Sequence, residues 1–249
     1  MQVFERGDMP LRMAFLVAAV ATLAACGGGG GGGDGSTANT PAAPAPSSTD
    51  VDAAYTAALR QPHTYSLTGT ASTGTSVMAT LSIAPASTAS YNGVSYDTTT
   101  LTSTVNVAGS PVSTSVTTLW LQQGSTALAF EASSMDTTCM YTSAQSALPH
   151  SASLGQQGPY ATSAEYPGCT HPGTIYTYDL SVGTVTQTWS YIAIKGRGYV
   201  CMTSSDAGPV GTSTEQDCFE VIDANGTLGT RAQVTIHDLN GVTITLSTS

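Results

Sequence analysis

The chain has 249 residues, of which 41% are hydrophobic and only 9% are charged. Six basic residues stand against 16 acidic ones, which gives a formal net charge of −10. Binding to nucleic acid or to anionic lipid head groups depends on basic patches, so this balance disfavours both kinds of partner.

The first element in chain order is a leader. An uncharged, mostly apolar run from Met13 to Ala25 follows Arg12. It is too short for the roughly 20 residues of a membrane-spanning helix, but it suits a secretory signal peptide. Glu5 and Asp8 are unusual before such a run, which leaves Met9 as an alternative start to Met1. We expect residues 1–25 to be removed from the mature protein.

The leader ends in Leu23-Ala24-Ala25-Cys26, and seven glycines follow it. This motif resembles the lipobox of bacterial lipoproteins, and the resemblance covers only this first part of the chain. It implies lipidation of Cys26, cleavage before it, and a membrane partner reached through the lipid. Gly27 in second place is typical of members sent to the outer membrane, facing the periplasm or the cell surface. The alternative is a secreted protein, cut after Ala25, with a free thiol.

Residues 26–48 form the next segment, which is rich in glycine, proline and serine. Such a composition has little apolar surface to offset the entropy of ordering the chain. We therefore expect a disordered tether. The folded domain is expected at 49–249, as one β-rich domain or as two halves divided near 133–172.

One short helix is predicted at the start of this domain. Thr49 or Asp50 can cap it, and Pro62 stops it. Its apolar residues have helical spacing: Val51, Ala54, Tyr55, Ala58 and Leu59.

Strand-like alternation of apolar and hydroxyl residues follows the helix. The predicted strands are 65–69, 77–83, 101–107, 112–121, 126–131, 175–182, 185–194, 199–203, 217–222, 228–237 and 242–246. Asn225-Gly226 and Asn240-Gly241 predict type I′ hairpin turns. Gln123-Gly124 and 195–198 predict two more hairpins. The fold class is therefore mainly β, an antiparallel sandwich or barrel-like sheet with one short N-terminal helix.

Four cysteines remain besides Cys26, an even number that favours two disulfides in an exported protein. We expect Cys139 to pair with Cys169, because they bracket the irregular segment. Cys201 and Cys218 should pair because they bracket one loop between two strands. A metal site is the disfavoured alternative, since the chain has no Cys-x-x-Cys and its histidines are scattered.

No motif for catalysis stands out, and we predict neither a catalytic residue nor a cofactor nor a bound metal. His237-Asp238 could serve as a base with its orienting acid, but polar hairpin residues are the favoured interpretation. The acidic series Glu215, Asp217, Glu220 and Asp223 could offer oxygens to calcium. A solvated strand face is the favoured interpretation, because the spacing fits no known calcium loop.

Two further groups are candidates for binding. Lys195 and Arg197, beside glycines, could make an anion contact, although a polar hairpin tip would look the same. Aromatic residues fall in the predicted strands and could form the core or line a cavity, the core being favoured. They are Trp120, Tyr176, Tyr178, Trp189, Tyr191 and Tyr199.

The sequence thus predicts a noncatalytic outer-membrane lipoprotein whose β-rich domain binds a partner or envelope component. One alternative is a carrier of lipid or another apolar ligand, similar in its order of elements to carriers of the LolB or LppX type. Another alternative is a hydrolase with an unrecognised site.

Overall fold

The computed structural model describes residues 44–248 except 92, 109, 111, 134–138, 167–180, 182 and 209–210. The leader, Cys26, most of the tether, Cys169, Tyr176 and Tyr178 lie outside the described residues.

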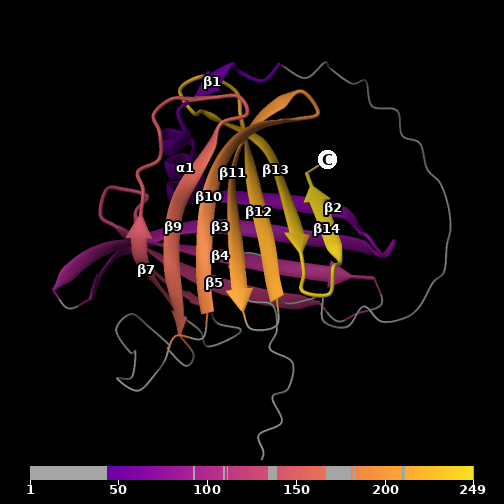
Figure 1. Cartoon of the computed structure of the whole chain (residues 1–249), viewed down its shortest axis with the longest axis horizontal. Helices are drawn as coiled ribbons and strands as arrows, with labels where there is room; N and C mark the ends of the chain where they lie inside the picture. The colour runs from indigo at the N-terminus through magenta and orange to yellow at the C-terminus, as the bar shows by residue number, and fades with distance from the viewer. Residues whose placement is uncertain are drawn as a thin grey trace, which may run out of the picture.

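The described chain forms a closed antiparallel β-barrel with one helix, α1 (Val51–Arg60) (Figure 1). Its strands in chain order are β2 (His63–Ala71), β3 (Ser76–Tyr91), β4 (Val94–Val107), β5 (Ser113–Gln122), β6 (Leu128–Ser133), β7 (Cys139–Gln145), β9 (Gln157–Tyr166), β10 (Gly183–Ile194), β11 (Arg197–Gly208), β12 (Gly211–Val221), β13 (Leu228–His237) and β14 (Thr243–Ser247). Around the barrel the order is β10-β11-β12-β13-β14-β2-β3-β4-β5-β6-β7-β9. The predicted mainly β, barrel-like fold is confirmed.

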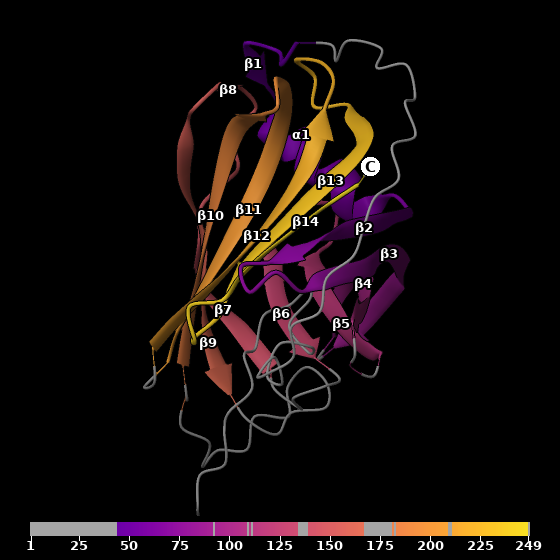
Figure 2. The same cartoon turned by 90° about the vertical axis from the view of Figure 1, so that its right-hand side faces the viewer.

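The barrel is flattened into two crossing walls. In Figure 1, strands β9 to β13 run from top to bottom, while β2 to β5 cross behind them at a steep angle. Figure 2 shows α1 at the upper end, behind β11 and β12. The helix contacts β3 on one wall and β11, β12 and β13 on the other, so it lies between the walls at that end.

Strand alternation decides what fills the barrel. Because successive side chains point to opposite faces of a strand, one set from each strand faces inward. The apolar inward side is concentrated on β13, β14, β2, β3 and β4, and the apolar face of α1 packs against it. The outward positions on these strands carry mainly serine and threonine.

Helix α1 begins where the sequence predicts. The carboxylate of Asp50 accepts the backbone N–H of Ala53 at 2.8 Å, which caps the first turn. The helix ends before Pro62, and its five predicted apolar residues are all buried.

A short two-stranded sheet lies beside this end of the barrel. It pairs β1 (Ser48–Thr49) with β8 (Ala152–Ser153). The segment expected to break the strand rhythm contributes two full barrel strands, β7 and β9. The strands that precede and follow this segment belong to the same barrel.

The turns at the two Asn-Gly pairs differ from the prediction. They do join β12 to β13 and β13 to β14, but a type I′ turn is wrong for both, because neither asparagine has positive φ. Instead the same pattern, Asp-x-Asn-Gly, recurs. Asp223 Oδ1 accepts the N–H groups of residues 225 and 227, and Asp238 Oδ1 accepts those of residues 240 and 242. Each aspartate thus holds a longer loop, and within that loop only the glycine has positive φ.

The hairpin predicted at 195–198 is confirmed. Lys195 has φ 50° and Gly196 has φ 81°, as a two-residue turn between twisted strands requires. It connects β10 to β11 directly.

Candidate functional site

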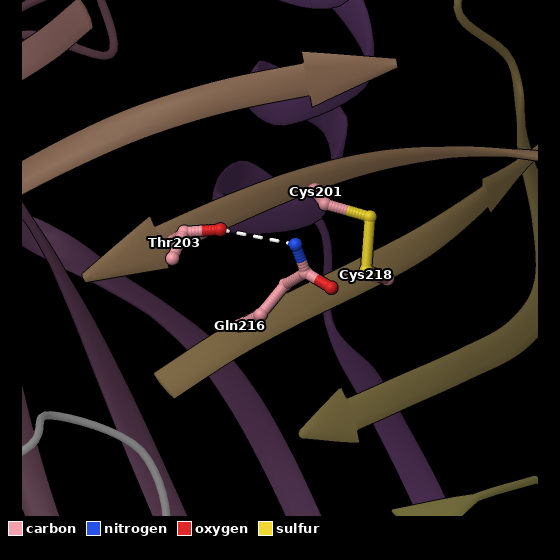
Figure 3. Close-up of a disulfide and its surroundings, with 4 residues drawn as sticks. All are labelled: Cys201, Thr203, Gln216 and Cys218. Atoms are coloured by element: carbon pink, nitrogen blue, oxygen red, sulfur yellow. Dashed lines mark hydrogen bonds between the residues drawn. A yellow bond between two sulfur atoms is a disulfide. The ribbon is translucent and has the colours of Figure 1, made fainter. Parts of the chain in front are cut away.

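The disulfide predicted between Cys201 and Cys218 is present. The two residues are directly opposite on β11 and β12, with Cα atoms 4.0 Å apart (Figure 3). On the same outward face, Gln216 Nε2 donates to Thr203 Oγ1 at 3.1 Å. This covalent link fixes the register of the two strands.

Cys139 is also disulfide-bonded, and its partner lies outside the described residues. The pairing of Cys139 with Cys169 therefore stays a prediction, which peptide mapping under non-reducing conditions can check.

The two basic residues of the predicted anion contact have different surroundings. Lys195 is exposed at the tip of the turn. Arg197 Nη1 lies 2.6 Å from Glu220 Oε1, a buried carboxylate on the outward face of β12. The charge of Arg197 is thus engaged within the barrel wall, and an anion contact at Lys195 stays a prediction.

His237 and Asp238 serve the turn between β13 and β14. A ring nitrogen of His237 lies 2.9 Å from Thr243 Oγ1 on an exposed face, and Asp238 accepts backbone N–H groups as described above. These contacts fit the hairpin interpretation of the pair.

The acidic series is divided between two faces of β12. Glu220 faces outward and Asp223 holds a turn, but Glu215 and Asp217 face inward and are only 1% and 3% exposed. Glu220, although it faces outward, is only 4% exposed beneath Arg197. The predicted solvated face is therefore wrong for Glu215, Asp217 and Glu220. For Glu215 and Asp217 the reason is strand alternation, which puts them on the same side as Phe219 of the core.

These two residues belong to a larger inward-facing group, which we call the acid belt. It comprises Glu131 on β6, Glu165 on β9, Gln187 on β10, Asp206 on β11, and Glu215 and Asp217 on β12. The turn after β12 lies against α1, because a Cβ at Gly226 would meet the backbone of Asp50 and Ala54. Most of the belt is therefore in the half of the barrel remote from that turn.

Gly183 makes room for two of the belt carboxyl groups. A Cβ at this position would lie 2.8 Å from Glu165 Oε2 and 3.6 Å from Asp206 Oδ1. The two carboxyl groups therefore converge over a residue without a side chain.

Burial makes two of the belt carboxyl groups, those of Glu131 and Asp217, hard to ionise. It raises the pKa of Glu131 to about 8, and the charge of Glu165 adds to this rise. Burial also raises the pKa of Asp217. Tyr55 of α1 has a raised pKa, first from burial, then from Tyr160, Asp217 and Glu131.

The described basic side chains are placed away from the belt. Arg60 at the end of α1 lies 2.7 Å from Asp97, and Arg197 is paired with Glu220 on the outside. Lys195 is at the turn tip, and Arg231 alternates with the inward Ala232 on β13. Within the described ranges, no three His, Cys, Asp or Glu side chains are grouped to hold a metal ion.

The outside of the barrel carries a second feature, which we call the aromatic stripe. Five rings, one from each of five adjacent strands, follow one another across the outward face. Neighbouring centroids are 6.1, 6.5, 4.7 and 5.9 Å apart, all in edge-to-face contact. In order the rings are Tyr96, Trp120, Phe130, Tyr141 and Tyr166.

Phe130 is buried within the stripe, and the other four rings are half-buried. Cys139 packs beside Phe130. The stripe is therefore a preassembled aromatic surface with partly accessible rings.

The predicted aromatic residues are distributed over both faces. Trp189 and Tyr191 are in the core, as favoured. Tyr199 packs outside, near the Cys201–Cys218 disulfide, and Trp120 is in the stripe.

No protein-family model, curated protein or solved structure matches this chain. In the part of the chain that the structure covers, no helix has the length and apolar composition needed to cross a membrane.

Sequence reasoning missed most of the stripe and most of the belt. Each group takes about one residue from each strand, so no local motif marks it. The available signal was alternation within single strands, which becomes informative only when the neighbouring strands and their register are known.

Proposed function

We propose that the chain is a noncatalytic, outer-membrane-anchored lipoprotein whose barrel binds an envelope protein through the aromatic stripe. The anchor rests on the lipobox at Cys26. The observation that carries the binding role is the row of five aromatic rings on the outward face of β4, β5, β6, β7 and β9.

The residue types of the stripe are those that dominate protein interfaces. Tyrosine, tryptophan and phenylalanine are enriched at interface cores, and a few such residues supply most of the binding energy. The rings already contact one another edge to face, so their side chains have little conformational entropy left to lose on binding. The hydroxyl residues Thr100 and Thr118, outward neighbours on β4 and β5, provide the polar rim that such interfaces have.

The charge of the chain favours a particular kind of partner. With a net charge of −10, long-range repulsion disfavours acidic surfaces. A partner with a neutral or basic contact surface is therefore preferred.

The carrier alternative meets a difficulty in the interior. Apolar side chains of α1 fill one end between the walls, and carboxyl groups line much of the remainder. An acyl chain placed against the belt would leave those polar groups without partners, which is costly in a dry interior.

Site-specific photo-crosslinking in intact cells tests the proposal. A photoreactive phenylalanine at Tyr96 or Tyr141 should give one discrete adduct, whose partner mass spectrometry identifies. The same probe at Met78, an outward β3 residue that is 55% exposed, should not give that adduct. With the partner purified, Trp120→Ala should weaken binding at least tenfold, whereas Met78→Thr should not. Equal adducts at all positions, or unchanged affinity in Trp120→Ala, would contradict the proposal.

A further inference from the structure

The acid belt has more hydrogen-bond acceptors than donors. Glu131 Oε2, Asp217 Oδ1 and Gln187 Oε1 are buried and have no hydrogen-bond partner among the described residues. All three residues face inward and are less than a tenth exposed. Buried polar atoms in folded proteins nearly always have a hydrogen-bond partner, so we expect a donor to bind at these oxygens.

Gln187 distinguishes the belt from a plain cluster of acids. A buried carboxylate can take up a proton and so become neutral, but an amide oxygen stays a hydrogen-bond acceptor. The Nε2 of Gln187 donates to Ser204 Oγ at 3.2 Å, which leaves its Oε1 as an acceptor. Ser204 is directly opposite Glu215, so the amide and that carboxyl share one inward row.

The surroundings of the belt add aromatic and apolar contacts. Tyr55 and Tyr160 meet edge to face at 5.6 Å, and Tyr55 is within electrostatic reach of Glu131 and Asp217. Beside the belt, the inward row of Asp217 continues into the apolar Val234 on β13 and Leu246 on β14. Carboxylates and aromatic rings attract ammonium groups, and apolar side chains favour a hydrocarbon tail.

We propose that the interior of the barrel is a binding site for a small amphipathic organic cation, a primary alkylammonium. The ammonium group donates to the carboxyl groups of the belt and to Gln187 Oε1. The hydrocarbon part packs against the inward apolar residues beside the belt, Val234 and Leu246. This site is separate from the aromatic stripe and does not depend on it.

Ammonium binding is linked to proton release. The pKa of Glu131 is raised to about 8, so at pH 7 its carboxyl group holds a proton that an ammonium ion must displace. Among the described residues, titratable groups face this region from α1, β2, β6, β9, β11 and β12. They are Tyr55, Tyr65, Glu131, Tyr160, Glu165, Asp206, Glu215 and Asp217. If one proton is displaced, affinity should rise by about tenfold per pH unit below pH 8.

Calorimetric titration of residues 44–249 with hexylammonium tests the site. This fragment contains the whole barrel, its helix and its core. Titrations in two buffers of different ionisation enthalpy count the protons released. We expect saturable binding with release of about one proton at pH 7. Hexanol and hexanoate, which match the tail but lack the cation, should not bind comparably.

Two variants and a matched control complete the test. Glu131→Gln and Asp217→Asn, which keep side-chain size, should each weaken hexylammonium binding at least tenfold. Glu220→Gln removes one negative charge from the outward face of β12 and should leave the affinity within about twofold, because this carboxylate faces away from the belt. Absence of saturable binding by the unaltered fragment, equal binding of hexanol, or equal loss in Glu220→Gln would overturn the inference.

Discussion

At the scale of single residues, Gly69 on β2 shows how closely two strands of the barrel approach each other. A Cβ at this position would lie 1.9 Å from the backbone oxygen of Thr245 on β14. Backbone cannot move aside as a flexible side chain can, so Gly69→Ala must shift the strands. We expect a loss of about 3 kcal/mol or more in the free energy of unfolding, measured by urea denaturation.

Gly74 provides the control for this substitution. It has φ +87° and nothing within 4 Å of an added Cβ. Gly74→Ala should therefore cost only the backbone strain, about 1 kcal/mol. Equal losses in the two variants would show that the contact with Thr245 is not the cause.

The free energy of unfolding is expected to depend on pH through Glu131. Its pKa is raised from 4.5 to about 8 by burial, so the folded state binds the proton more tightly than the unfolded state. The contribution of this carboxyl group to the free energy of unfolding is therefore fully present below about pH 4.5. It is lost as the pH rises toward 8. Glu131→Gln, which cannot ionise, should gain about 3.5 kcal/mol relative to the unaltered protein between pH 5 and pH 8.

Thermal or urea unfolding at several pH values measures this difference. Asp223→Asn is a suitable comparison, because that carboxylate is exposed and its pKa is lowered by hydrogen bonds from residues 227 and 225. Asp223→Asn should therefore not flatten the dependence of unfolding free energy on pH above pH 5. A profile for Glu131→Gln parallel to that of the unaltered protein would contradict the assignment.

At the scale of elements, helix α1 depends on its first turn. Asp50 Oδ1 caps the N–H of Ala53, while its Oδ2 lies 3.4 Å from the ring of the exposed His150. Asp50→Ala should cost about 1 kcal/mol of stability through the lost cap. His150→Ala should cost less than about 0.5 kcal/mol, because an exposed ion pair contributes little. Equal costs in chemical denaturation would assign the effect to the ion pair instead.

The hairpin of β11 and β12 is closed by a covalent bond. The Cys201–Cys218 disulfide spans 17 positions, and the loss of such a crosslink is expected to cost about 3 kcal/mol through the entropy of the unfolded chain. The double variant Cys201→Ala, Cys218→Ala tests this by urea denaturation. Thr203→Val, which removes only the neighbouring hydrogen bond to Gln216, should cost about 1 kcal/mol. Unchanged stability in the double variant would mean that the strands hold each other without the bond.

At the scale of the whole molecule, the C-terminal strand closes the barrel. Strand β14 pairs with β13 on one side and with β2 on the other, and it contributes the buried Ile244 and Leu246. Removal of residues 243–249 should open both edges and expose the interior. We expect loss of cooperative thermal unfolding by circular dichroism. Residues 44–249 with an intact C-terminus should unfold in one transition, and a truncated chain that does the same would contradict this role for β14.

The sequence by itself determined what depends on near neighbours. Helix α1 with its cap at Asp50, the turn at Lys195-Gly196 and the Cys201–Cys218 pair were predictable, because each is set within a short stretch of chain. The alternation that marks a mainly β fold is equally local. Even so, the Asn-Gly turns were predicted with the wrong type, because Asp223 and Asp238 capture backbone N–H groups that a two-residue turn would leave to the strands.

Only the tertiary structure decided which face of each strand is inside and which strands are neighbours. On β12 the alternation sets Glu215, Asp217 and Phe219 against Gln216 and Cys218, and either set could have faced water. Barrel closure placed the acids inward, and the register across β4 to β9 aligned five aromatic rings outside. Both candidate sites arise from residues far apart in the chain, whose meeting depends on strand order and register rather than on any local pattern.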